Sequence, residues 1–109
     1  MKSMLKAAEQ EFAIYEKTGE RVILQQAGEK LWNVFGRYME IRDKQRYDNH
    51  KDLKNASFSN EKLRSLCQDV EDLHDYFYNA EINIVDEKAV YLFKESIKKL
   101  KNRIKMLNL

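Results

Sequence analysis

The absence of proline is the feature that most restricts what this chain can fold into. None of its 109 residues is proline and only three are glycine. Proline breaks the interior of a helix and glycine weakens it, whereas most other residues tolerate helical backbone. The sequence therefore predicts long helices joined by short connections.

Apolar residues recur at steps of three and four, which is the spacing of an amphipathic helix. This periodicity predicts four helices, at about residues 3–18, 20–46, 59–81 and 86–107. Four such helices most simply form an all-α, antiparallel four-helix bundle in a single domain covering residues 1–109. The expected core stripes are Leu5, Ala8, Phe12 and Tyr15; Leu24, Ala27, Leu31, Phe35, Tyr38 and Ile41; Leu63, Leu66, Val70, Leu73, Phe77 and Ala80; and Val90, Phe93, Ile97, Leu100, Ile104 and Leu107.

The helix boundaries carry their own signals. Gly19 suits the left-handed conformation that ends many helices, and Asp86 is a good N-cap for the last helix. Ser57 or Ser59 is expected to cap the third helix, after one long polar connection over residues 47–55. On the second helix, Gly28, Trp32 and Gly36 form a stripe that would let a neighbouring helix approach closely.

The overall composition favours a soluble protein of the cytoplasm. Charged residues make up 35% of the chain with mixed sign, and the net charge of +2 does not by itself indicate nucleic-acid binding. The single cysteine, Cys67, excludes an internal disulfide. The sequence also lacks the apolar run of a signal peptide or a membrane span, so we expect no membrane association.

Some apolar residues lie outside the four stripes, and a bundle of this size has limited interior. We expect part of this set to cover a second surface, which suggests a homodimer. The residues are Val22, Val34, Met39, Tyr76, Tyr91, Leu92 and Met106.

Two segments stand out from the helical pattern: Gly28-Glu29-Lys30-Leu31-Trp32-Asn33, and Leu73-His74-Asp75-Tyr76-Phe77-Tyr78-Asn79. Together with His50-Lys51-Asp52-Leu53 between them, they resemble the archaeal PaREP family, usually placed in the HEPN superfamily. The resemblance covers about residues 20–107. It implies a HEPN-like bundle of four or five helices, often dimeric. Many HEPN proteins are ribonucleases, or partners of nucleotidyltransferases in toxin–antitoxin and antiviral systems.

The arginine–histidine spacing argues against a typical HEPN nuclease. Such nucleases resemble one another in having four to six residues between an arginine and a histidine. Three residues separate Arg46 from His50, seven separate Arg42 from His50, and nine separate Arg64 from His74. Arg46 and His50 remain candidates for general acid–base and phosphate-stabilising roles only if a loop brings them together.

His74 has the richer surroundings in the sequence. Glu71 at i−3 would favour its imidazolium form, and Cys67 and Tyr78 lie within helical reach. It could be a base or substrate-positioning residue in a groove lined by Tyr76 or Tyr78. We favour the alternative, in which its ring bonds a tyrosine or a carboxylate across a helix interface.

Cys67, Glu71 and His74 follow an i, i+4, i+7 pattern, but one thiol and one histidine fall short of a zinc site, so we expect no metal or cofactor. The third helix is acidic and the fourth is basic, which predicts pairing along their edges. Alternatively, Lys98, Lys99 and Arg103 would form an exposed patch for RNA or phosphate.

Three functions remain. The first, which we favour, is a HEPN-like module, non-catalytic or partner-dependent, that acts as a homodimer and with a nucleotidyltransferase in a toxin–antitoxin or defence context. The second is a metal-independent ribonuclease with a non-standard site drawn from His74, His50, Arg46 and Tyr78. The third is a purely structural protein-interaction bundle. The sequence does not decide whether the protein is an enzyme and leans against it.

Overall fold

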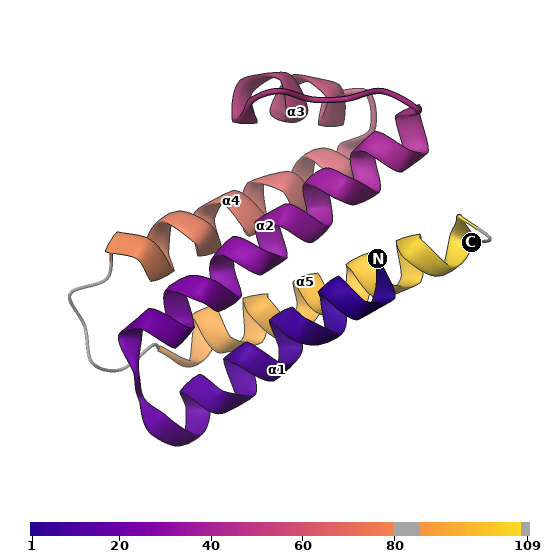
Figure 1. Ribbon diagram of the computed structural model, residues 1–109. Coiled ribbons are helices and arrows are strands. Elements are labelled where there is room, and N and C mark those ends of the chain that lie inside the picture. The colour runs from indigo at the N-terminus through magenta and orange to yellow at the C-terminus, as the bar shows by residue number, and fades with distance from the viewer. Residues whose placement is uncertain (80–85, 108–109) are drawn as a thin grey trace.

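The computed structural model describes residues 1–79 and 86–107 (Figure 1). The ordered elements in these ranges are all helical, which confirms the all-α class. They are α1 (Lys2–Thr18), α2 (Arg21–Asp43), α3 (His50–Ser57), α4 (Glu61–Asn79) and α5 (Glu87–Met106). The described part thus contains five helices, one more than the four expected.

The additional helix is α3, which lies where a long loop was expected, so the prediction of an unstructured connection over 47–55 was wrong. The Asn49 side chain accepts a hydrogen bond from the Asp52 N–H and caps the helix. Leu53 then buries its side chain against the core. A helix with one cap and one buried apolar residue is too short to show the apolar periodicity that predicts helices from sequence.

Other boundaries follow local backbone chemistry. Gly19 is left-handed (φ 71°) and ends α1, and Asp86 accepts from the Ala89 N–H at the start of α5, both as predicted. The second helix stops at Asp43, before the expected residue 46, because Lys44 adopts a left-handed conformation (φ 53°). Residues 80 and 81, expected in the third helix, lie outside the described residues.

The expected serine cap of α4 was wrong. The side chain of Asn60 caps it, accepting from the backbone N–H groups of Lys62 and Leu63. The hydroxyls of Ser57 and Ser59 instead donate to backbone carbonyls at the end of α3, those of Lys54 and Ala56. The three polar residues from 57 to 60 (Ser57, Ser59 and Asn60) all suit a cap by type, so only geometry selects Asn60.

The long helix α2 is central: it packs most extensively against α1 on one side and α4 on the other, and α5 completes the layer beside α1 (Figure 1). α3 lies across the end of the α2–α4 pair. The start of α1 and the end of α5 lie close together, since Lys2 and Lys105 line the same cavity.

The core is built mainly from the expected stripes. Three phenylalanines from α1, α4 and α5 stack at its centre: the ring centroids of Phe12 and Phe93 are 4.2 Å apart, and those of Phe12 and Phe77 are 5.9 Å apart. Val34 and Met39, two of the apolar residues outside the predicted stripes, are fully buried in this core and so do not belong to a second surface. Ile41, assigned to the core, is only partly buried.

Candidate functional site

The two unusual segments face each other across the α2–α4 interface. A Cβ placed on Gly28 would lie 3.2 Å from the ring of Phe77 and 3.5 Å from the Cα of His74. The glycine therefore allows the two helices to approach closely, as its stripe with Trp32 predicted. The two unusual segments, one on α2 and one on α4, therefore contact each other.

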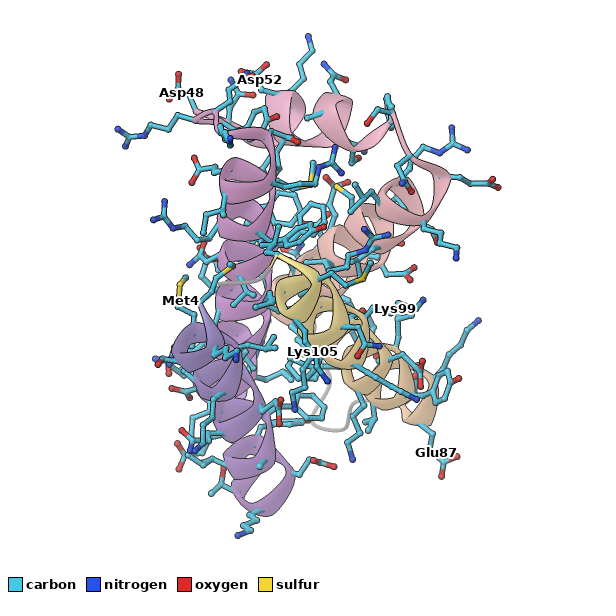
Figure 2. The ribbon with its side chains drawn as sticks, turned by 90° about the vertical axis from the view of Figure 1, so that its right-hand side faces the viewer. Met4, Asp48, Asp52, Glu87, Lys99 and Lys105 are labelled. Carbon is cyan, nitrogen blue, oxygen red and sulfur yellow. The ribbon has the colours of Figure 1, made fainter. Side chains whose placement is uncertain are left out.

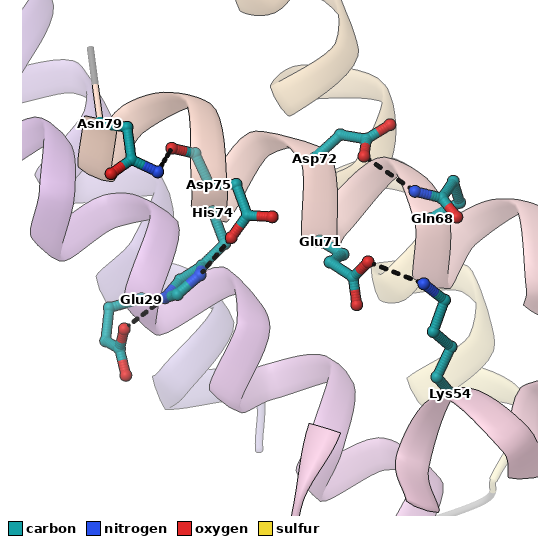
Figure 3. Close-up of polar contacts among 8 residues, drawn as sticks. All are labelled: Glu29, Lys54, Gln68, Glu71, Asp72, His74, Asp75 and Asn79. Carbon is teal, nitrogen blue, oxygen red and sulfur yellow. Dashed lines mark hydrogen bonds and ion pairs between the residues drawn. The ribbon is translucent and has the colours of Figure 1, made fainter. Parts of the chain in front are cut away.

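His74 binds a carboxylate across this interface. Its Nε2 lies 2.6 Å from Oε2 of Glu29 on α2, and its Nδ1 lies 3.6 Å from Oδ1 of Asp75 on its own helix (Figure 3). Glu71, expected to favour the imidazolium form of His74, instead pairs with Lys54 of α3 at 3.0 Å. The favoured interpretation of His74, a ring bonded to a tyrosine or carboxylate across a helix interface, matches this geometry, although it did not name Glu29 as the partner.

His50 joins the same cluster from α3. Its ring centroid lies 4.4 Å from that of Trp32 and 6.0 Å from that of His74, in an edge-on arrangement. Trp32 in turn lies 6.3 Å from His74. The fold thus brings together two histidines that are 24 positions apart in the sequence, on a platform formed by the indole.

Tyr78 extends the cluster toward solvent. Its ring stacks on His74 with a centroid distance of 6.2 Å, and 59% of the residue is exposed. Its backbone carbonyl accepts from the side chain of Gln25, which adds a further link between α4 and α2. Tyr76 is partly buried against the core and packs near Phe77 rather than beside His74.

A shallow cavity of about 300 Å³ adjoins the cluster on the side of His50, and Trp32, Asn33, Gly36 and Arg37 are among the other residues that line it. Arg46 lines a separate, more open cavity of about 640 Å³, together with Arg37 and Tyr47. The loop between α2 and α3 therefore places Arg46 and His50 in adjacent cavities that share Arg37, not in one.

The segment that leads into α3 is held by Tyr47. Its hydroxyl donates to Oδ2 of Asp43 at 2.6 Å, and its backbone N–H donates to Glu40. The hydrogen bond to Asp43, with partial burial, raises the pKa of Tyr47 to about 12, because ionisation would remove the donated proton next to a carboxylate. This clamp fixes where α3 begins, and hence where His50 lies.

Cys67 and its neighbours do not form a metal site. The thiol is buried beside Ser57, and burial raises its pKa, which disfavours the thiolate that a metal would need. Glu71 is engaged by Lys54, and this hydrogen bond raises the pKa of the lysine. In the described residues, no group of three or more histidine, cysteine, aspartate or glutamate side chains is arranged to hold an ion.

The candidate basic patch on α5 divides between different neighbours. Lys98 lies toward α1, whereas Lys99 acts on Asp69 of α4, whose pKa is raised by burial and held back by that lysine. Arg103 is partly buried and donates to the Tyr38 hydroxyl at 3.4 Å. The three side chains therefore do not share one exposed face, as Figure 2 shows for Lys99, which points away from α1.

The expected edge pairing of α5 with the acidic helix holds in part, since Lys99 lies close enough to act on Asp69 of α4. Two α5 lysines form ion pairs with α1 instead: Lys94 with Glu16 at 3.6 Å, and Lys101 with Glu9 at 3.2 Å. Of the other acidic residues of α4, Glu71 pairs with Lys54 of α3, and Asp72 accepts from Gln68 of α4 itself (Figure 3).

Sequence reasoning missed two members of the cluster, Glu29 and Trp32, as partners of the histidines. A signal for them existed. Gly28 was expected to face a close neighbour, and Glu29 and Trp32 flank that same helical face. Glu29 follows the glycine at which α4 comes closest to α2, so its carboxylate can reach a side chain of α4. His74 is the titratable residue of α4 that faces Gly28.

No helix among the described residues is long and apolar enough to span a membrane. In comparisons with known proteins, the chain matches no family model, no curated protein and no solved structure.

Proposed function

We propose that this chain is a non-catalytic helical module of HEPN-like arrangement that works through a partner. The observation that carries the proposal is the setting of His74, whose two ring nitrogens both face carboxylates, those of Glu29 and Asp75. The Nε2 hydrogen bond to Glu29 at 2.6 Å joins α4 to α2, whereas Nδ1, 3.6 Å from Asp75, lies beyond hydrogen-bond distance, so the bond that this ring makes is a contact between helices.

The charges closest to His74 support the same conclusion. Phosphodiester cleavage needs positive charge beside the base, to stabilise the charge that develops on the phosphate. The charged groups paired with His74 are two carboxylates, which would repel a phosphate; Arg37 lines the cavity beside His50, and Arg46 lines the adjacent one. The segment that resembles the PaREP family thus serves to join α2 to α4.

The partner in this proposal is a second copy of the chain, and beyond it a nucleotidyltransferase in a toxin–antitoxin or defence context. Exposed apolar side chains that remain outside the core support association. They are Met4, Ile14, Val22, Phe58, Tyr78, Tyr91 and Met106. The nucleotidyltransferase and the cellular context rest on the resemblance alone.

Two measurements test this proposal. Purified protein at high concentration should leave single-stranded RNA intact, with or without a chelator. Light scattering should give the mass of a dimer. Cleavage of RNA that is lost in the variant His74→Ala would overturn the non-catalytic role, and a monomer at every concentration would overturn the homodimer.

A second function, metal-independent ribonuclease, is favoured by one observation: His50 and His74 lie with ring centroids 6.0 Å apart. In such a site, one histidine would accept the proton of the ribose 2′-hydroxyl as its oxygen attacks phosphorus. The other would donate a proton to the departing 5′-oxygen. For this function, His50→Ala and His74→Ala should each abolish cleavage, whereas Glu29→Gln should increase it by freeing Nε2 of His74.

A further inference from the structure

α1 and α5 face each other, with Lys105 of α5 on the side toward α1 (Figure 2), and a groove runs between them. Two cavities of about 460 and 380 Å³ lie along it and share Glu9 and Lys101 at the boundary. On α1 the lining runs from Lys2 to Glu16, which corresponds to about 21 Å of helix. Each volume falls in the range of ligand pockets, roughly 300–1,000 Å³.

The floor of the groove is apolar. It consists of core side chains that α1 and α5 share, so the groove opens directly onto the hydrophobic core. These side chains are Leu5, Phe12, Phe93, Ile97 and Ile104. These side chains are at most 6% exposed, so the apolar side chains of an occupant would cover their outer edges together with the aliphatic stems of the rim lysines.

The rim is strongly basic. Six lysines line the two cavities, against two glutamates. Glu9 and Glu16 are paired with Lys101 and Lys94. The other four rim lysines have no ion-pair partner among the described residues; they are Lys2, Lys6, Lys98 and Lys105.

We propose that this groove binds an acidic amphipathic helix of a partner protein. Leucine-like side chains of that helix would pack on the floor, and its glutamates or aspartates would pair with the free lysines on both sides. The inference rests on the proposed partner-dependent role, and it specifies the surface and the chemistry of the partner.

Other occupants match the groove less well. RNA would satisfy the lysines but brings no apolar groups to the floor, and the two lining phenylalanines are buried and cannot stack on bases. A lipid bilayer is flat, whereas the apolar residues lie at the bottom of a groove. A second copy offers its acidic helix α4, but the apolar side of α4 is buried in its own core.

The test uses a synthetic peptide of about five helical turns, with leucines on one face and glutamates on its flanks. Its affinity for the full chain is measured by fluorescence anisotropy, beside a peptide in which every glutamate is lysine. We expect the acidic peptide to bind at least about tenfold more tightly and to weaken as salt is raised. Methyl NMR shifts should map to Leu5, Ile97 and Ile104.

Charge reversal at two free rim lysines, Lys6→Glu with Lys98→Glu, should weaken the acidic peptide by about tenfold or more. The matched control reverses two exposed lysines on α3 and α4, Lys51→Glu with Lys62→Glu, and should change affinity less than about twofold. The neutral pair Lys6→Gln with Lys98→Gln should fall between them, and circular dichroism confirms the fold of each variant.

Equal binding of the two peptides, shifts that map elsewhere, or equal losses in the rim and control variants would each overturn the proposal. Displacement of the peptide by a short single-stranded RNA would assign the groove to nucleic acid instead. A dimer that only the rim variants dissociate would assign it to a second copy. RNA cleavage would contradict the proposed non-catalytic function but would not affect the peptide-binding result. Failure of the proposed function and failure of the groove proposal can therefore be told apart.

Discussion

The α2–α4 and α1–α5 contacts differ in how they are closed. Between α2 and α4, a glycine admits the facing helix, a histidine bonds a carboxylate at 2.6 Å and aromatic rings cover the joint. Between α1 and α5, two exposed lysine–glutamate pairs cross a groove that holds open cavities. Both pairs of helices share one core, but small residues and specific polar contacts close only the first. The open contact is the one that retains capacity for a partner.

The largest effect should come from the residue that closes the tight contact. Phe77 is fully buried between Gly28 and two other phenylalanines. Phe77→Ala should therefore lower the free energy of unfolding by about 3–5 kcal/mol, measured by urea denaturation. Tyr91→Ala, at an aromatic residue of α5 that is 65% exposed, should change it by less than about 0.5 kcal/mol. Similar losses in both variants would remove the contrast between core and surface.

The close approach at Gly28 should be the next most sensitive feature. Gly28→Leu places a side chain against Phe77 and should cost about 1–3 kcal/mol of unfolding free energy. At Gly36, an added Cβ would lie at an ordinary 3.5 Å from Leu53. Gly36→Ala should therefore stabilise the protein, by about 0.4–1 kcal/mol, since alanine is the better helix former. A stable Gly28→Leu protein would show that α2 and α4 are not closely apposed there.

The hydrogen bond between Tyr47 and Asp43 holds the segment that leads into α3, and removing it tests whether α3 is fixed against the α2–α4 pair. Tyr47→Phe removes the hydrogen bond to Asp43 and should cost about 1 kcal/mol at neutral pH. Because the folded pKa of Tyr47 is raised from 10.0 to about 12, its contribution is fully present below pH 10 and is lost as pH rises toward 12. Unfolding measured from neutral pH to pH 11 should show a shallower loss in the variant. An unchanged pH profile would contradict the clamp.

The smallest expected effects are the coupling energies of two ion pairs, Glu29–His74 and Glu9–Lys101. A double-mutant cycle on Glu29 and His74 should give a coupling of about 0.2–1 kcal/mol, since the imidazole is largely covered while the carboxylate is half exposed. The same cycle on Glu9 and Lys101, both substantially exposed, should give less than about 0.3 kcal/mol and lose it in salt. A stronger coupling at Glu9–Lys101 would reverse the order of the two contacts.

The regular spacing of apolar residues made most of the helices predictable from the sequence. The stripes of α1, α2, α4 and α5 extend over several turns, so that one misread residue such as Ile41 does not change the pattern. α3 depends on one cap and one buried leucine and was missed. The choice of Asn60 over Ser57 and Ser59 as a cap depends on geometry within four residues, which composition does not contain.

The sequence pointed to His74 as a residue of the candidate site, but it did not identify the residues that contact His74. His74 was expected to bond a tyrosine or a carboxylate across a helix interface, and it bonds Glu29, a residue that the prediction did not name. Its proximity to His50 depends on α3 and on the Tyr47 clamp, and neither follows from helical periodicity. Partners across an interface are set by how two helices are rotated, and the sequence of one helix specifies only its own face.

The burial of Cys67 makes this protein its own reporter of local opening. The thiol is 1% exposed beside Ser57, and α3 is tied to α4 nearby by the Lys54–Glu71 ion pair. An alkylating reagent can reach the sulfur only when this short helix lifts away or when the chain unfolds. The rate of modification would therefore measure how often α3 leaves α4, and a rate faster than global unfolding would identify α3 as a separately opening unit of the native protein.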